Sequence, residues 1–528
     1  MSTARIVPAC NPSPTPATSD RVQRSFALRS QTAAHDAFTP AAIEIDNGDE
    51  ARYADKCGTY TKGIQQAAIG LVDLAAYQTF RDALDSGNSA DFEAITLGGT
   101  RTLNGPQGGL AFDLECLDSS QFSVPPAPAL TSEQYATELM ELYWASLLRD
   151  VAFTDYSGKI VAQNAAKELS AMPAYTGPRN GANEVTPDLL FRGGFKGETV
   201  GPYLSQFLLQ DTSMGVLPIA QKYTSNMAKM DYMLDPKTFL EVQNGVSTGL
   251  SLKPVMTPLY LRDGRGLAAY THIDVLYQAY FMAYLVLNTI NGGKPVPMNP
   301  GNPYNGDKTQ NGFNTFGQPD IAATLAAVAS EALKAVWYQK WFVHLRHRPE
   351  SGGGIVYLSK TPGAGSVEGK LSPTVLNSQA VQTCFTTNGS YFLSQAFPEG
   401  SPTHPAYPTG HGTVAGACIT VLKFFFNGGF VIPKPVVPLD DGSSTKPYTG
   451  GDAGMMTVNS ELNKLAHNIS FGHGIHAGIH WRSDTDTSIQ LGEAVALSTL
   501  QDRADTYNEK FTVQLQKVDG STAAISNQ

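Results

Sequence analysis

The chain has 528 residues, 42% of them hydrophobic, and a formal net charge of −10 from 37 Lys and Arg against 47 Asp and Glu. This length supplies ample core for one large domain or for two fused halves. Because no basic run is dense enough to follow a phosphate backbone, we expect no nucleic-acid partner.

The predicted elements begin after an arm rich in Pro, Ser and Thr at residues 1–20, and ordered structure should start near Arg21. Helical periodicity follows at residues 59–84, 132–153 (Thr131 and Gln134 fitting a capping box), 203–209, 272–288 and 320–344. Strand signals are short, as at residues 354–358 and 429–432. We therefore predict a mainly α, large helical-bundle protein with a few short β pieces.

The same pass predicts the domain organisation. After the flexible arm 1–20 come a helical N-terminal half, 21–319, and a helical C-terminal half, 320–528, which carries the candidate site described below. The longest strongly apolar stretch, residues 275–287, is shorter than the ~20 residues that cross a bilayer. Since no signal peptide is visible, we expect a soluble, cytoplasmic protein without membrane partners.

The first candidate site segment is KWFVHLRHRP. Its Lys340 and Arg348 lie about 80° apart around a helix, and Pro349 disfavours the helical conformation at Arg348. The helix should end there, so that both cations can meet one anion, which Arg binds through a planar fork of donors. A solvated basic helix end is the alternative.

The second candidate segment, HPAYPTGHG, begins at His404 and precedes a strongly apolar helical pattern at 413–426. Helix N-termini bind anions through free N–H groups and the helix dipole. Gly410 would allow close approach of the backbone, Thr409 adds a hydroxyl and His411 adds a titratable ring. A buried helix start capped by threonine is the alternative, but it explains neither histidine.

The third candidate segment is FGHGIHAGIHWRSD, whose His473, His476 and His480 should share one helical face. Asp484, four residues after His480, can accept its Nδ1 proton and leave Nε2 free as a nucleophile or ligand. A zinc or nickel site is less favoured, because one helix rarely supplies three ligands and no HExxH motif is present.

Taken in this order, the three segments resemble the vanadium-dependent haloperoxidases and the related acid phosphatases, with their Lys…ArgPro, ProSerGlyHis and Arg…His…Asp motifs. Further stretches, LLFRGGFKGETVGPYLSQFLL, MNPGNPY and ELNKLAHNISFGHGIHAGIHWRSD, resemble the algal and cyanobacterial bromoperoxidase branch, as does His404. The matching motif residues are Lys340, Arg348, Pro349, Pro408, Gly410, His411, His480 and Asp484, with Thr409 in place of the serine.

The resemblance implies that hydrogen peroxide oxidises bromide or iodide to hypohalous acid, which then halogenates small organic acceptors. It implies His480 as the protein ligand to vanadium, with Asp484 as its hydrogen-bond partner. His411, His404 and Lys340 become the catalytic residues, and vanadate is held by Lys340, Arg348, Thr409, Gly410, His411 and His473. The alternative is a phosphohydrolase in which His480 is the nucleophile, because phosphate and vanadate are nearly isosteric.

The chain departs from the family pattern at two positions. Thr409 keeps the hydroxyl of the usual serine and adds a methyl group. The arginine that the family has six residues before the axial histidine is Gly474 here, so His473 is the candidate replacement cation. Because this departure puts vanadate affinity in doubt, a non-catalytic helical assembly protein stays open as a third interpretation.

Three further expectations concern assembly and lesser sites. The resemblance implies a large homo-oligomer, and it permits a calcium site in the oxygen-rich loop around Asp307, where an ordinary turn is the favoured interpretation. Trp337 could line a halide pocket or belong to the core. The five cysteines lack CxxC spacing, which favours reduced thiols and leaves one bridged pair open.

Overall fold

The computed structural model describes residue 15, residues 17–363 and residues 370–528. Within these ranges the α-helices are α1 (Arg21–Asp36), α2 (Asp49–Arg52), α3 (Leu74–Ser86), α4 (Ser89–Glu93), α5 (Glu133–Leu148), α6 (Ile160–Ser170), α7 (Pro236–Gln243), α8 (Gly264–His272), α9 (Gln278–Leu287), α10 (Gln318–Tyr338), α11 (Pro349–Lys360), α12 (Pro373–Leu376), α13 (Gln379–Asn388), α14 (Gly410–Phe425), α15 (Val458–Phe471) and α16 (Arg482–Thr506).

Shorter elements connect these helices. They are the 3-10 turns η1 (Pro106–Leu110), η2 (Ser119–Gln121), η3 (Phe153–Gly158), η4 (Pro187–Leu189), η5 (Gln206–Leu208) and η7 (Ala453–Met455), and the π-helical segments η6 (Gln339–His344) and η8 (Gly472–His476). The strands are β1 (Gln66–Ala68), β2 (Leu71–Val72), β3 (Thr212–Met214), β4 (Leu217–Ile219), β5 (Val436–Pro438), β6 (Thr445–Pro447), β7 (Thr512–Gln516) and β8 (Thr522–Ser526), paired consecutively as antiparallel hairpins. The predicted mainly α fold with short β pieces is confirmed.

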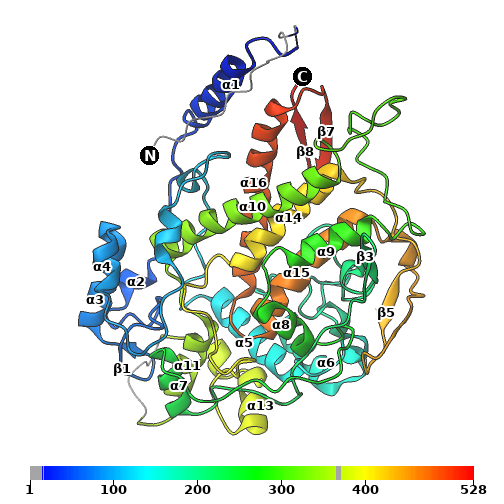
Figure 1. The fold of residues 1–528 in the computed structure, drawn as a ribbon. Helices are drawn as coiled ribbons and strands as arrows, with labels where there is room; N and C mark the ends of the chain where they lie inside the picture. Colours follow the sequence, from blue (N-terminus) through cyan, green and yellow to red (C-terminus); the bar gives the residue numbers. More distant parts are fainter. Residues whose placement is uncertain (1–14, 16, 364–369) are drawn as a thin grey trace.

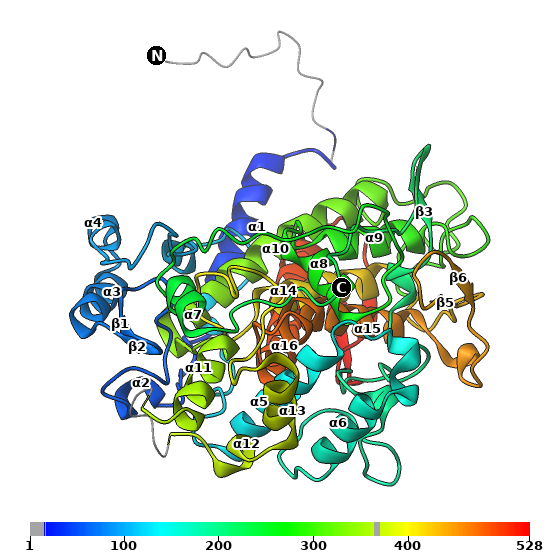
Figure 2. The ribbon, with the colours of Figure 1, turned by 90° about the horizontal axis from the view of Figure 1, so that it is seen from below.

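Helices α10, α14, α15 and α16 form the centre of the molecule (Figures 1 and 2). Helix α14 crosses α16 closely, because a Cβ at Gly416 would lie 1.9 Å from the Ile489 carbonyl oxygen, and one at Gly492 would lie 1.8 Å from a carbonyl oxygen of α14. Only glycine permits this approach. The crossing joins the N-termini of the two helices, where the Thr409 N–H donates to the Asp484 carbonyl at 3.2 Å.

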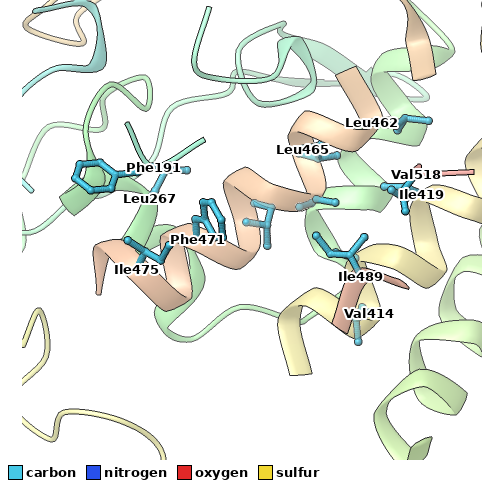
Figure 3. Packing of buried hydrophobic residues seen from close by; sticks show 14 of the residues in the cluster. Phe191, Leu267, Val414, Ile419, Leu462, Leu465, Phe471, Ile475, Ile489 and Val518 are labelled. Carbon is cyan, nitrogen blue, oxygen red and sulfur yellow. The ribbon is translucent and has the colours of Figure 1, made fainter. Parts of the chain in front are cut away.

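Buried side chains anchor the segment that carries the third motif. Phe471 at the end of α15 and Ile475 in η8 are almost fully buried, and they lie close to Leu267 of α8 and Phe191 in the same core cluster (Figure 3). Burying a side chain of this size stabilises the fold by roughly 1.5–3 kcal/mol. The backbone of the following histidine-rich turn is therefore held in place by its neighbours on the N-terminal side.

Several predicted helix boundaries are wrong. Residues 59–84 contain the hairpin β1–β2 before α3, which starts where the Asp73 side chain accepts from the Ala76 N–H. The helix expected at 272–288 begins only at α9, and residues 203–209 contain only the turn η5. In α5 the capping residue is Ser132, whose hydroxyl accepts from the Tyr135 N–H, rather than the predicted Thr131.

Both predicted strands are also wrong. Residues 354–358 belong to α11, because Pro349 at its first position favours a helix start and the apolar side chains after it pack in the core as a helix face. Residues 429–432 form a loop in which Val431 makes a single bridge to Thr457. Short apolar runs cannot be assigned to strand or helix by periodicity alone.

The N-terminal arm predicted at residues 1–20 falls largely outside the described residues, and α1 begins at Arg21. One stretch, residues 318–344, is long and apolar enough to cross a membrane by length and composition. It is the continuous segment α10–η6, which packs against α14 and α16 in the centre of the fold. Half of its most apolar window is buried, as expected of a helix that packs in the core.

Candidate anion site

The three sequence segments meet around the N-termini of α14 and α16. Lys340 lies on η6, Arg348 immediately precedes α11, Thr409 precedes α14, and His480 stands two residues before α16. Both π-helical segments, η6 and η8, border this region, and π-helical turns are frequent at functional sites. Residues separated by up to 140 positions in the chain thus share one location.

Arg348 connects two of the candidate histidines. Its backbone is extended (φ −82°, ψ 155°), as Pro349 requires of the preceding residue, so its side chain leaves the helix direction and turns inward. Its Nη1 lies 2.8 Å from His480 Nε2, and its Nη2 lies 2.9 Å from His404 Nδ1. The predicted turn at Arg348 is confirmed.

Lys340 and Arg348 are two buried cations without an acidic partner among the described residues. Their side chains are 0% and 1% exposed. Lys340 Nζ donates to the carbonyl oxygens of Pro405 and Ala406 at 2.8 and 2.7 Å. Burial, and then the charge of Arg348, lowers the pKa of Lys340 well below its usual range, and burial lowers the pKa of Arg348 to about 10. Uncompensated buried charges are costly, and a bound anion would relieve that cost.

His480 is held through its Nδ1 atom. Asp484 Oδ2 lies 2.9 Å from Nδ1 and also accepts from the Trp481 N–H at 3.1 Å. The second oxygen of Asp484 accepts from Arg346 Nη1 at 2.6 Å. Because the Asp484 oxygen is the acceptor at Nδ1, Nδ1 carries the proton, and the Nε2 lone pair accepts from Arg348 Nη1. The predicted pairing of His480 with Asp484 is present.

His411 is oriented by a residue that the sequence reasoning missed. Its Nε2 lies 2.9 Å from Oδ1 of Asp274, which follows α8 by two residues. The opposite carboxylate oxygen of Asp274 is buried and has no hydrogen-bond partner among the described residues. No sequence motif marks this aspartate, since it lies 137 positions away from its histidine.

His473 stacks on His411, with ring centroids 3.7 Å apart, and its ring lies 5.7 Å from that of His480. Burial, followed by His411, His480 and Arg348, lowers the pKa of His473 well below its usual value. Its Nδ1 atom is buried without a hydrogen-bond partner in the described part of the chain. This nitrogen therefore has an unused hydrogen bond, on a ring that lies beside His411 and His480.

The start of α14 adds further hydrogen-bonding groups. Thr409 Oγ1 is buried and has no partner among the described residues, and the first-turn N–H groups of a helix lack intrahelical acceptors. A Cβ at Gly410 would lie 3.2 Å from the Trp337 ring, which itself lies 4.8 Å from the His404 ring. Glycine thus lets the helix start approach Trp337, whose predicted halide contact remains a prediction.

The structure corrects one prediction about the histidine segment. His473, His476 and His480 do not share a helical face, because the π-helical turn η8 is followed by Gly478 with φ +85°. His476 instead points away, and its Nε2 contacts the Tyr203 hydroxyl at 2.8 Å. Periodicity predicts a regular helix and cannot anticipate a π turn.

Position 474, where the family has an arginine, lies next to the proposed ligand His480. Arg482, two residues after His480, is not a replacement for that arginine, because it pairs with buried Glu141, its Nε donating at 2.9 Å. A Cβ at Gly474 would lie 3.1 Å from His480 Cβ, so position 474 directly adjoins the candidate ligand. His473 remains the neighbouring polar side chain on this segment.

Lesser predicted sites have the following geometry. Cys57, Cys116, Cys384 and Cys418 are free thiols, and Cys10 lies outside the described residues. Asp307 Oδ1 accepts from the Thr309 and Gln310 N–H groups, which is an ordinary turn arrangement. The described residues contain no group of three or more His, Cys, Asp or Glu that could hold a metal ion.

The chain is similar to known proteins along most of its length. A family profile described as the VCPO second helical-bundle domain matches residues 320–509. The chain is 31% identical to a vanadium-dependent bromoperoxidase of Corallina officinalis, over 88% of this chain and 90% of that protein. It belongs to the vanadium-dependent bromoperoxidase family. A bromoperoxidase of Ascophyllum nodosum is 30% identical over 97% of this chain and 93% of that protein.

The fold of this bromoperoxidase family member is also that of a solved relative. The second vanadate-dependent bromoperoxidase of Ascophyllum nodosum, determined as a homohexamer, superposes with a TM-score of 0.90 and 27% identity, over 100% of this chain and 94% of that chain. The family resemblance inferred from the motifs is thereby confirmed along nearly the whole chain.

Proposed function

We propose that this chain is a vanadate-dependent bromoperoxidase, which uses hydrogen peroxide to oxidise bromide or iodide to hypohalous acid. The observation that carries the proposal is the pair of buried, unpaired cations, Lys340 and Arg348, beside His480 Nε2. Small organic molecules are the proposed acceptors of the oxidised halogen. The alternative, a phosphohydrolase, is not favoured, because the relatives that match nearly the whole chain are bromoperoxidases.

The described residues fit vanadate. An oxyanion would satisfy the two cations, and it would give partners to Thr409 Oγ1 and His473 Nδ1, which have none among the described residues. We infer that Lys340, Arg348, Thr409, Gly410, His411 and His473 would hold the anion and that His480 Nε2 would bind vanadium. Bound vanadate supplies a Lewis acid that activates peroxide without changing its own oxidation state.

The histidines of the site would manage protons. His411, held by Asp274 at 2.9 Å, is positioned to accept a proton from incoming peroxide through its ring. His404 contacts Arg348, and its ring lies 4.8 Å from that of Trp337 in a tilted arrangement, so it can exchange protons along the same wall of the site. Lys340 Nζ is fixed by two carbonyl oxygens, so it would place its positive charge beside the bound anion.

The test compares two reactions in the same preparation. Bromination of monochlorodimedone and hydrolysis of nitrophenyl phosphate should be measured with and without added orthovanadate. Bromination that requires vanadate and peroxide is the expected result. Phosphate ester cleavage that vanadate inhibits, without bromination, would support the phosphohydrolase, and neither reaction would support a non-catalytic assembly protein.

We further propose a homo-oligomer, supported by the homohexameric state of the solved relative. A cytoplasmic location, the absence of nucleic-acid and membrane partners, calcium in the Asp307 loop, and the division at residues 319 and 320 all remain predictions. Light scattering of the purified full chain measures the assembly directly.

A further inference from the structure

Helix α1 is held by few contacts with its own chain. None of its residues is buried, and in Figures 1 and 2 it stands out from the body of the molecule. Val22 and Phe26, one turn apart, are 79% and 68% exposed. A helix with large apolar side chains in water is stabilised when another surface covers them.

The cations of α1 also lack partners. Arg21, Arg24 and Arg29 form no ion pair with any of the described residues. Arg24 donates to the Ala17 carbonyl oxygen and Arg29 to that of Ser25. The helix thus presents three arginines together with an apolar stripe.

The surface next to α1 has the complementary character. A cavity of about 940 Å³ separates α1 from residues 112–122 and from the ends of α10 and α16. Asp36 and Asp502 line it without a Lys or Arg partner among the described residues, whereas Asp113 and Glu115 pair with Lys334 and Arg503. Burial, and then neighbouring carboxylates, raises the pKa of Asp502 to about 6. The lining thus holds six acidic residues against two cations, Arg29 and Lys334, and the wall is net acidic.

The same rim exposes further apolar side chains. Phe112 is 81% exposed and Leu114 is fully exposed, and both belong to the cavity lining. One region of the surface, built from α1, residues 112–122 and the ends of α10 and α16, thus combines exposed apolar side chains, arginines without ion pairs and a net acidic wall. These are the components of a self-complementary contact, in which each copy offers the same surface.

We propose that α1 and the rim at residues 112–114 form a contact with a second copy of this chain, in which Arg21 and Arg24 of one α1 face the acidic wall of the other. This contact rests on the homo-oligomer proposed above and assigns the surface through which its copies meet. A second copy is favoured as occupant because the surface carries both complementary charges and because the solved relative, superposable over this entire chain, is a homohexamer. An anionic membrane is less suitable, since the acidic wall would repel it.

The test uses the full chain and a double variant, Phe26→Asp with Phe112→Asp. Both side chains are largely exposed, so charge there disturbs the contact and spares the core. The matched control is Ile160→Asp, at a position on α6 that is also 68% exposed. Particle mass is measured by light scattering, folding by the thermal midpoint, and activity by bromination.

We expect the wild type and Ile160→Asp to be oligomers and the double variant to fall to half the particle mass or less, with an unchanged thermal midpoint of the monomeric fold. A photoreactive benzophenone side chain in place of Val22, in a mixture of ¹⁴N and ¹⁵N chains, should then join α1 peptides to residues 112–122 or 502–505 across isotopes. An oligomer unaffected by the double variant would overturn the proposal. So would a wild type that is monomeric, or one that instead binds phosphatidylserine vesicles through Phe26. Particle mass tests the contact and bromination tests the proposed activity. Because the two are measured separately, a failure of one proposal can be told from a failure of the other.

Discussion

Asp484 joins His480 to Arg346: one carboxylate oxygen lies 2.9 Å from His480 Nδ1 and the other 2.6 Å from Arg346 Nη1. Arg346 in turn contacts Glu138 of α5 at 3.3 Å. The orientation of the proposed vanadium ligand therefore depends on a buried ion network that reaches across the fold. Partners of this kind fix the tautomer and the direction of a ligating imidazole.

The first prediction concerns that network. Arg346→Gln removes the cation between two buried carboxylates, so it should destabilise the fold by roughly 3–5 kcal/mol, the cost of breaking a buried ion pair. Urea unfolding measures this loss. Arg503→Gln breaks the partly exposed pair with Glu115 and should cost much less, and equal losses in the two variants would contradict the argument.

The second prediction concerns the vanadium ligand. His480→Ala should abolish vanadate-dependent bromination and leave the thermal midpoint largely intact, because it removes the one proposed bond from protein to metal. His476→Gln is the control, since His476 is equally buried on the same segment but points away. Vanadate binding by equilibrium dialysis should disappear only in the first variant, and retained activity there would refute the assignment.

The third prediction concerns proton transfer. His411→Ala should lower the turnover number on the order of 10²-fold or more, the usual contribution of a positioned acid–base group. Asp274→Asn keeps the shape of the partner and removes its charge, so it should lower turnover less and shift the pH–rate profile. Steady-state bromination across pH checks both; an unchanged turnover in His411→Ala would leave that histidine a structural role.

The fourth prediction tests His473 as the substitute for the family arginine. Because its surroundings lower the pKa of the ring, we expect a neutral hydrogen-bonding partner for the anion near pH 7. His473→Gln, which keeps a hydrogen-bonding group, should then bind vanadate nearly as well as the wild type. His473→Ala should lose about 0.5–1.5 kcal/mol of binding free energy.

Equilibrium dialysis against pH separates this from the original hypothesis of an imidazolium clamp. If the charge is needed, the Gln and Ala variants should lose equal affinity, and both should lack a pH dependence that the wild type shows. A wild-type profile parallel to both variants would instead favour the neutral contact.

The fifth prediction concerns stability and pH. His467 lies between Glu198 Oε1 at 2.5 Å and Asp486 Oδ1 at 2.8 Å. Burial opposes its charge, but the two carboxylates outweigh burial and raise the pKa of His467 to about 9. The interaction of protonated His467 with the two carboxylates therefore stabilises the fold. Its full contribution is present below the unfolded pKa of about 6.5 and is lost as pH rises through about 9.

His467→Gln should therefore be less stable than the wild type by roughly 3 kcal/mol at pH 6, from the size of that pKa difference. The gap between the two proteins should shrink by pH 10, when the wild-type imidazole is neutral. Urea unfolding at both pH values measures the gap, and a gap independent of pH would show that ionisation of His467 plays no part.

The sequence by itself determined the chemistry of the site. Residue types such as Lys340, the Arg348-Pro349 pair and the Gly410-His411 pair carry local rules. A proline restricts the preceding backbone, and a helix start leaves N–H groups free that a glycine lets a ligand approach. The long helix at 320–344 was also predictable, since its apolar period extends over many turns.

Only the tertiary structure decided which distant side chains meet. Asp274 reaches His411, and Arg346 reaches Asp484, through packing of helices that no local pattern specifies. The direction of His476 and the register of His473 depend on a π-helical turn and on the left-handed Gly478, which the helical period cannot reveal. The physical reason is that local sequence limits backbone geometry within a few residues, whereas contacts across the fold depend on how whole helices pack.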